Sequence, residues 1–156
     1  MQFLADFNFL DIVEEQLATV PDSPKKTLWL TQAAFFKEDY NEALSHIEQL
    51  LETNPKNYEW LLLKSDICFT AERLFESEEV LLKVIKIKPN APKAFAMYLR
   101  LGNIYLIRKA WQDAKTIFLK ACELKNNSSL SWLGLGKAHF HLNEIRQAEE
   151  ALNLAN

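Results

Sequence analysis

Few residues in this chain have the type and spacing that chemistry requires. The histidines are His46, His139 and His141. The last two are separated by one residue, and on a helix this spacing sends their imidazoles to different faces, so they make a poor pair of metal ligands. Neighbouring acids such as Glu78-Glu79 suit a solvated helix surface better than general acid–base catalysis. We therefore predict a protein that is not an enzyme, with no catalytic residue, no metal site and no cofactor.

The composition favours a helical protein. The 156 residues are 49% hydrophobic, enough for a continuous core, and include only 3 Gly and 5 Pro. The signals of β-strands are missing, because the chain has no sustained alternation of polar and apolar residues and no Asn-Gly or Asp-Gly turn. The net charge of −3 gives no general attraction to nucleic acid. No apolar run approaches the roughly 18 residues of a membrane helix, so no membrane association is expected.

The N-terminus and the cysteines indicate a cytoplasmic location. Residues 1–6 lack the basic segment that opens a secretory signal. Cys68 and Cys122 are far apart in the chain, and both fall on apolar stripes of expected helices. We expect two buried, reduced thiols.

The elements that would position a site follow a period of 34 residues. Pro21, Pro55 and Pro89 recur at this interval, and the stretch from 132 to 136 repeats the frame of the stretch from 98 to 102. This period is that of the tetratricopeptide repeat (TPR), a pair of antiparallel helices A and B, and the chain is identified as a member of that family. The resemblance implies an all-α, right-handed solenoid of stacked helix pairs, in which Gly102 and Gly136 let neighbouring helices approach closely.

The same frame divides the chain, taken as one TPR domain, into repeats. Residues 1–21 are the second helix of a partial repeat. The frame then gives repeats at 24–57, 58–91, 92–128 and 129–156. The third of these contains a three-residue insertion, and the fourth lacks a capping helix. Ser23 and the end of the loop 126–129 are expected helix caps. Because both ends carry apolar stacking faces, we expect either a segment of a longer solenoid or end-to-end self-association.

The TPR resemblance also implies that the A helices line a concave groove. Equivalent positions in successive A helices predict an apolar and aromatic lining with one polar row. The predicted partner-binding residues are Trp29, Gln32, Phe36, Asp66, Phe69, Arg100, Asn103, Ile107, Lys137 and Phe140. Such a groove suits an amphipathic helix or an extended apolar segment. Either a partner or the remainder of the native protein could cover it.

A narrower resemblance concerns the second half of the chain. Residues 98–105, 132–136 and 148–152 resemble the C-terminal TPR region of the cilia- and flagella-associated TPR family of the axonemal central apparatus. This implies a non-enzymatic scaffold that binds other axonemal subunits in ciliary or flagellar motility. The alternative is a generic cytosolic TPR adaptor of a chaperone or ubiquitin-ligase assembly. Co-chaperone TPRs grip a carboxylate with Lys and Asn, and this chain has Leu28 and Gln32 at the first two of those positions.

Overall fold

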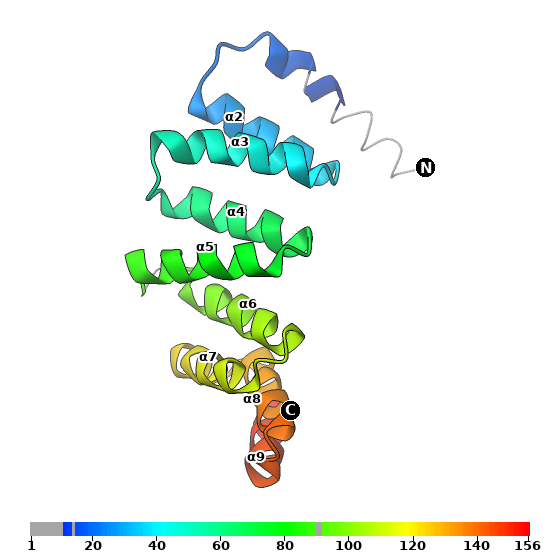
Figure 1. The fold of residues 1–156 in the computed structure, drawn as a ribbon, viewed down its shortest axis with the longest axis vertical. Coiled ribbons are helices and arrows are strands. Elements are labelled where there is room, and N and C mark those ends of the chain that lie inside the picture. The colour runs from blue at the N-terminus through cyan, green and yellow to red at the C-terminus, as the bar shows by residue number, and fades with distance from the viewer. Residues whose placement is uncertain (1–10, 14, 90–91) are drawn as a thin grey trace. The chain divides into compact units, whose positions relative to one another are not determined.

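The computed structural model describes residues 11–13, 15–89 and 92–156, and all regular structure within them is helical. This confirms the predicted all-α class. Residues 11–13 and 15–18 are helical, and eight further helices follow (Figure 1). They are α2 (Pro24–Phe36), α3 (Tyr40–Thr53), α4 (Tyr58–Thr70), α5 (Leu74–Ile87), α6 (Ala94–Ile107), α7 (Trp111–Leu124), α8 (Ser129–His141) and α9 (Ile145–Ala155).

The chain divides into two compact units, residues 1–87 and 88–156. In the first unit α2 packs against α3 and α4 packs against α5, and in the second α6 packs against α7 and α8 against α9. Each pair is the helical hairpin that the 34-residue period predicts. None of the helices within the described residues is both long and apolar enough to cross a membrane.

Local side chains start several of these helices. The Ser23 hydroxyl accepts a hydrogen bond from the backbone N–H of Lys26 (3.2 Å), and Pro24 follows at the first helical position, as the sequence predicted. Pro suits that position because its missing N–H would have no intrahelical partner. The expected cap of α8 is wrong in detail. Ser128 is the N-cap residue, but its side chain makes no capping hydrogen bond.

The turns inside the hairpins share one backbone conformation. The residue after each A helix's C-cap has positive φ, near 60°, and its follower donates an N–H to the carbonyl five residues back. These positive-φ residues are Glu38, Glu72, Lys109 and Asn143, and the donors that follow them are Asp39, Arg73, Ala110 and Glu144. This is the Schellman motif, whose left-handed position is usually Gly. None of the four is Gly here.

The first unit packs around small and apolar residues of α2 to α5. Ala34, Ala43 and Ile47 belong to its buried cluster. Ser77 of α5 is fully buried. Its hydroxyl lies 3.1 Å from the Ser65 hydroxyl and also donates to the Ser65 carbonyl oxygen (3.0 Å), so the contact between α4 and α5 includes a satisfied polar pair.

The second unit packs around Phe118 of α7, which is almost completely buried. A Cβ added to Gly102 of α6 would lie 2.7 Å from the Phe118 ring, and one added to Gly134 of α8 would lie 2.3 Å from it. A Cβ added to Gly136 would lie 2.8 Å from Leu152 of α9. The close approaches expected at Gly102 and Gly136 are present, and the tightest one, at Gly134, was not predicted.

Both cysteines are buried and free, as predicted. Burial raises the pKa of Cys68 to about 11, and burial also raises the pKa of Cys122. Thiols of this kind react slowly while the fold stays closed, because the thiolate is the reactive species.

Candidate functional site

The predicted partner-binding residues fall on the A helices of both units. In the first unit Trp29, Gln32 and Phe36 of α2 are exposed, Trp29 by 40% and Phe36 by 69%. Asp66 and Phe69 of α4 are half-buried. The three α2 residues are therefore the accessible part of the predicted lining in this unit.

In the second unit the predicted residues lie on α6 and α8, which pack against each other. Asn103, Ile107, Lys137 and Phe140 are exposed. Arg100 is half-buried, and its burial lowers the pKa of the guanidinium. These side chains offer a mixed polar and apolar surface.

The repeat pattern also placed Leu28, Phe35, Leu99 and Leu106 on the groove lining. Leu28 and Phe35 are partly buried against the core of the first unit. Leu99 and Leu106 are partly buried against the core of the second. These residues therefore contribute more to the cores than to an open surface.

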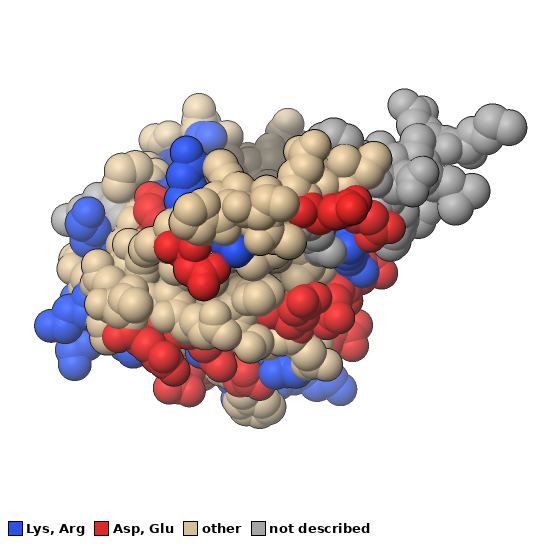
Figure 2. All heavy atoms as spheres, turned by 90° about the horizontal axis from the view of Figure 1, so that it is seen from above, with Lys and Arg blue, Asp and Glu red and all other residues tan. Residues whose placement is uncertain are grey.

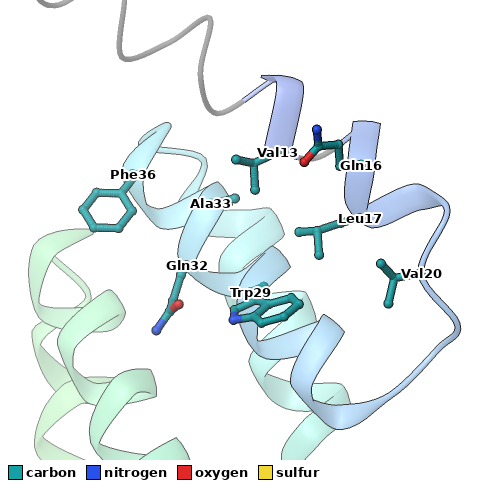
Figure 3. Close-up of a pocket in the computed structure, with 8 residues that line it drawn as sticks. All are labelled: Val13, Gln16, Leu17, Val20, Trp29, Gln32, Ala33 and Phe36. Atoms are coloured by element: carbon teal, nitrogen blue, oxygen red, sulfur yellow. The ribbon is translucent and has the colours of Figure 1, made fainter.

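The structure brings the three α2 residues together with a second wall that the sequence did not predict. A groove of about 440 Å³ lies between α2 and the preceding segment (Figure 3). Its lining residues are Val13, Gln16, Leu17, Val20, Trp29, Gln32, Ala33 and Phe36. Trp29 lies near Leu17 and Val20, and Phe36 lies toward the other end (Figure 3). The interval of four between Val13 and Leu17 is the sequence signal that could have indicated this wall, because it places both side chains on one face of a helix.

Contacts at both ends hold the segment 11–20 against α2, and they define this end groove. At one end the Lys26 ammonium donates to the Val20 carbonyl oxygen (2.8 Å) and to Asp22 (2.9 Å). At the other end Lys37 pairs with Asp11 (2.7 Å). Leu17 is only 5% exposed and anchors the middle. The two walls of the groove are thus joined by packing and by charge pairs.

The end groove is apolar, with two amides. Among the residues that the structure describes, none that lines the groove is ionisable. The Lys25 ammonium lies 4.9 Å from the centre of the Trp29 ring, in a cation–π contact beside the groove. Seen from above, the described surface is largely uncharged, with acidic and basic side chains scattered over it (Figure 2). The described lining can bind apolar side chains, and it presents no charged group of its own to a phosphate or carboxylate.

A different groove of about 490 Å³ lies between α3, α4 and α5. Glu48, Glu52, Glu76 and Glu79 line it together with Lys64 and Lys83. Lys64 is paired with Glu48 at 3.0 Å. Its mixed, partly neutralised charges resemble an ordinary solvated surface.

The titratable residues of the second unit form a structural link. Lys115 of α7 donates to both carboxylate oxygens of Glu144, at 2.8 and 3.1 Å. The Nδ1 of His139 lies 2.5 Å from the same carboxylate. The hydrogen bond from Lys115, and then that from His139, lowers the pKa of Glu144. His139, whose side chain is 13% exposed, is thus part of a hydrogen-bond network. The imidazole of His141 stacks on the indole of Trp111, with ring centroids 3.9 Å apart. Within the described ranges no group of three or more His, Cys, Asp or Glu could hold a metal.

Solved structures of similar fold come from MamA proteins. A crystal structure of MamA has a TM-score of 0.81 and 15% identity, and the match covers 99% of this chain and 89% of that chain. The "41-end" MamA from Desulfovibrio magneticus RS-1 has a TM-score of 0.79 and 17% identity, covering 94% of this chain and 81% of that chain. At this level of identity the likeness shows the fold alone, a TPR-type helical solenoid.

Sequence comparison gives a closer relationship. A family model described as "Cilia and flagella-associated protein 70 C-terminal domain" matches residues 31–156. The human cilia- and flagella-associated protein 70 is 32% identical over 129 residues, which is 83% of this chain and 11% of that protein. The protein of the same name from Macaca fascicularis is 40% identical over 74 residues, 47% of this chain and 7% of that protein. The chain thus spans about a tenth or less of the length of these curated relatives. The helical hairpins and the match over most of the chain together show that it belongs to the family of the cilia- and flagella-associated protein 70 C-terminal domain.

Proposed function

We propose that this chain is a non-enzymatic scaffold that binds another protein subunit in the axoneme of a cilium or flagellum, and that it contributes to motility there. Family membership supports the ciliary location, since the relatives are named as cilia- and flagella-associated proteins. The TPR-type fold supports protein binding, because TPR arrays present long surfaces built from successive helices.

The exposed aromatic side chains of the end groove indicate which residues bind the partner. The end groove places two large, exposed aromatic side chains, Trp29 and Phe36, on a wall without ionisable groups. Aromatic residues in apolar pockets supply much of the binding energy of protein interfaces. The proposed partner surface is therefore the end groove, with Trp29, Gln32 and Phe36 as its contact residues on α2. The predicted lining residues of α4, and those of α6 and α8, are proposed as partner contacts within their own units.

Proximity labelling in ciliated cells tests this function. The chain is fused to a biotin ligase and compared with the variants Phe36→Ala and Phe75→Ala. Phe75 of α5 is the matched control, because it is 70% exposed against 69% for Phe36 but does not line the end groove. We expect axonemal proteins to be labelled by the wild type and by Phe75→Ala, and to be depleted with Phe36→Ala.

Two results would contradict the proposal in different ways. Labelling of heat-shock chaperones or ubiquitin-ligase subunits in place of axonemal proteins would favour a generic cytosolic adaptor. Labelling of the same axonemal neighbours by both variants would keep the ciliary role and reject the end groove as its contact surface.

A further inference from the structure

The end groove corresponds to a place in the second unit that is filled by a helix. The segment 11–20 and α2 correspond to α7 and α8, with residue numbers that differ by 105. Leu17 corresponds to Cys122, and both are 5% exposed. Ala33 corresponds to Ala138, and both are buried. The two pairs of helices therefore have buried side chains at corresponding positions.

In the second unit a third helix packs on that pair. α6 contacts both α7 and α8. The buried residues on α6 include Met97, Tyr98, Leu101 and Ile104, and all of its buried side chains are uncharged. In the first unit, within the described residues, the corresponding position beside α2 and the segment 11–20 is the end groove.

We propose that the end groove binds an amphipathic α-helix of a protein partner, which packs on α2 and the segment 11–20 as α6 packs on α7 and α8. This inference rests on the proposed function and specifies the class of its partner. The bound helix would complete a helix layer that the fold already builds once within the same chain.

The charges around the groove favour a partner helix whose buried face is uncharged. The nearby charges at its two ends are paired within the chain, Asp11 with Lys37 and Asp22 with Lys26. The described lining residues include no cation, and the Lys25 ammonium beside the groove already contacts the Trp29 ring. A partner carboxylate buried in the groove would therefore lose its hydration with little compensation. The partner's buried face must therefore be apolar, as that of α6 is.

The groove also favours a helix over an extended segment. An extended backbone needs hydrogen-bond partners for its N–H and C=O groups. The described side chains that line the groove offer the amides of Gln16 and Gln32 and the indole N–H of Trp29 as their polar groups. A helix satisfies its own backbone, and its apolar side chains can fill the groove.

The shape of the groove indicates what the helix carries. In the second unit the aromatic ring between helices comes from Phe118, and the glycines Gly102 and Gly134 face it. In the first unit the corresponding residues are Val13, which is smaller than Phe118, and Trp29, which is larger than Gly134. The aromatic surface is thus supplied by α2. A partner helix that resembles α6, with a small residue at its centre, fits against it.

A peptide built from α6 is therefore the probe. It has the 14-residue sequence of α6 with Lys in place of Ala96, Asn103 and Ile107, which are exposed in that helix, and it carries a fluorescent label. Its binding to the full 156-residue chain is measured by anisotropy. We expect saturable one-to-one binding that changes little between about 0.05 and 0.5 M salt, because the contact is apolar. The control peptide carries Leu101→Asp in addition and is expected not to bind.

Three variants of the chain locate the site. Trp29→Ala is expected to weaken binding about thirty-fold, the effect of losing an interface hot spot. Gln16→Trp adds a large side chain at an exposed lining position and is expected to block binding while the circular dichroism spectrum and melting temperature stay unchanged. Phe75→Ala is expected to bind like the wild type.

Several outcomes would overturn the inference. Binding that persists in both Trp29→Ala and Gln16→Trp would place the helix elsewhere. Dimerisation of the chain that requires Trp29, without peptide binding, would make a second copy the occupant. Absence of peptide binding together with axonemal labelling that depends on Phe36 would reject the helix and leave the proposed function standing. Peptide binding without axonemal neighbours would reject the function and leave the helix site standing.

Discussion

At the scale of single residues, the second unit depends on one aromatic ring between glycines. Phe118 packs so closely on α6 and α8 that neither Gly102 nor Gly134 has room for a Cβ. Gly costs about 1 kcal/mol relative to Ala inside a helix. The packing of the Phe118 ring against two helices must offset that cost.

The two glycines of α8 are predicted to respond differently to Ala. Gly134→Ala would place its Cβ 2.3 Å from the buried Phe118 ring, and we expect it to destabilise the protein by about 1–2 kcal/mol after the gain in helix propensity. Gly136→Ala would meet the flexible, partly exposed Leu152 at 2.8 Å, so its change should stay within about 0.5 kcal/mol. Urea unfolding measures both. A larger loss for Gly136→Ala would be incompatible with this packing.

At the scale of the elements, the four hairpins are closed by the same turn and held by different side chains. The Schellman turns place Glu, Glu, Lys and Asn in the left-handed conformation, which costs a non-Gly residue about 1–2 kcal/mol. The hairpin α8–α9 is also linked to α7, because Glu144 accepts hydrogen bonds from Lys115. The stability of the hairpins therefore depends on their turns and on hydrogen bonds between helices, as well as on the packing of apolar helix faces.

Replacing a strained turn residue with Gly is predicted to stabilise the hairpin. Glu72 is exposed and has a φ of 59°. Glu72→Gly should relieve the strain of the left-handed conformation. Because Gly loses more backbone entropy on folding, part of this gain is cancelled, and the net stabilisation should be about 0.5–1 kcal/mol. Asn143→Gly should gain less, because Asn tolerates this conformation. The midpoints of urea unfolding measure both variants, and the midpoint of Glu72→Gly should rise more than that of Asn143→Gly. A lower midpoint for Glu72→Gly would show that its carboxylate has a stabilising role.

The ionised carboxylate of Glu144 is predicted to stabilise the second unit in a pH-dependent way. Its pKa is lowered from the ordinary value of 4.5, first by the hydrogen bond from Lys115 and then by that from His139. A lowered pKa in the folded state means that the stabilisation is complete above the ordinary value and is lost as the pH falls through the lower, folded value. Glu144→Gln should therefore be less stable than wild type at neutral pH.

The difference between Glu144→Gln and wild type should shrink as the pH falls below about 4.5, where the wild-type carboxylate also becomes neutral. Thermal melts from neutral to acidic pH measure it. Glu149→Gln is the control, because Glu149 is exposed on the same helix α9. A stability difference that stays constant with pH would mean that Glu144 acts through packing rather than charge.

At the scale of the whole molecule, the chain has two compact units, each with its own buried core and its own buried thiol. Cys68 belongs to the core of the first unit and Cys122 to that of the second. In a repeat protein, stability is approximately a sum of local terms and nearest-neighbour terms. The two thiols can therefore report the opening of each unit separately.

Thiol labelling is predicted to separate the units. In Gly134→Ala, which acts in the second unit, Cys122 should react about five- to thirty-fold faster than in wild type, the ratio that corresponds to a loss of about 1–2 kcal/mol. Cys68 should change much less. Mass spectrometry of labelled peptides follows each thiol, and the single-thiol variants Cys68→Ser and Cys122→Ser serve as controls. Equal acceleration of both thiols would show that the two units open together.

The sequence by itself determined the all-helical TPR-type fold and the family. These features are local, because the period of 34, the prolines and the Ser23 cap act within a few helical turns of the chain. The tertiary structure decided that Gly134 lies against Phe118 and that Ser65 and Ser77 pair. It also decided that Val13, Gln16, Leu17 and Val20 form the second wall of the end groove. Those contacts join residues on different helices. They depend on how far apart neighbouring backbones lie and on which side chain fills the space between them, and a repeat period does not specify either quantity.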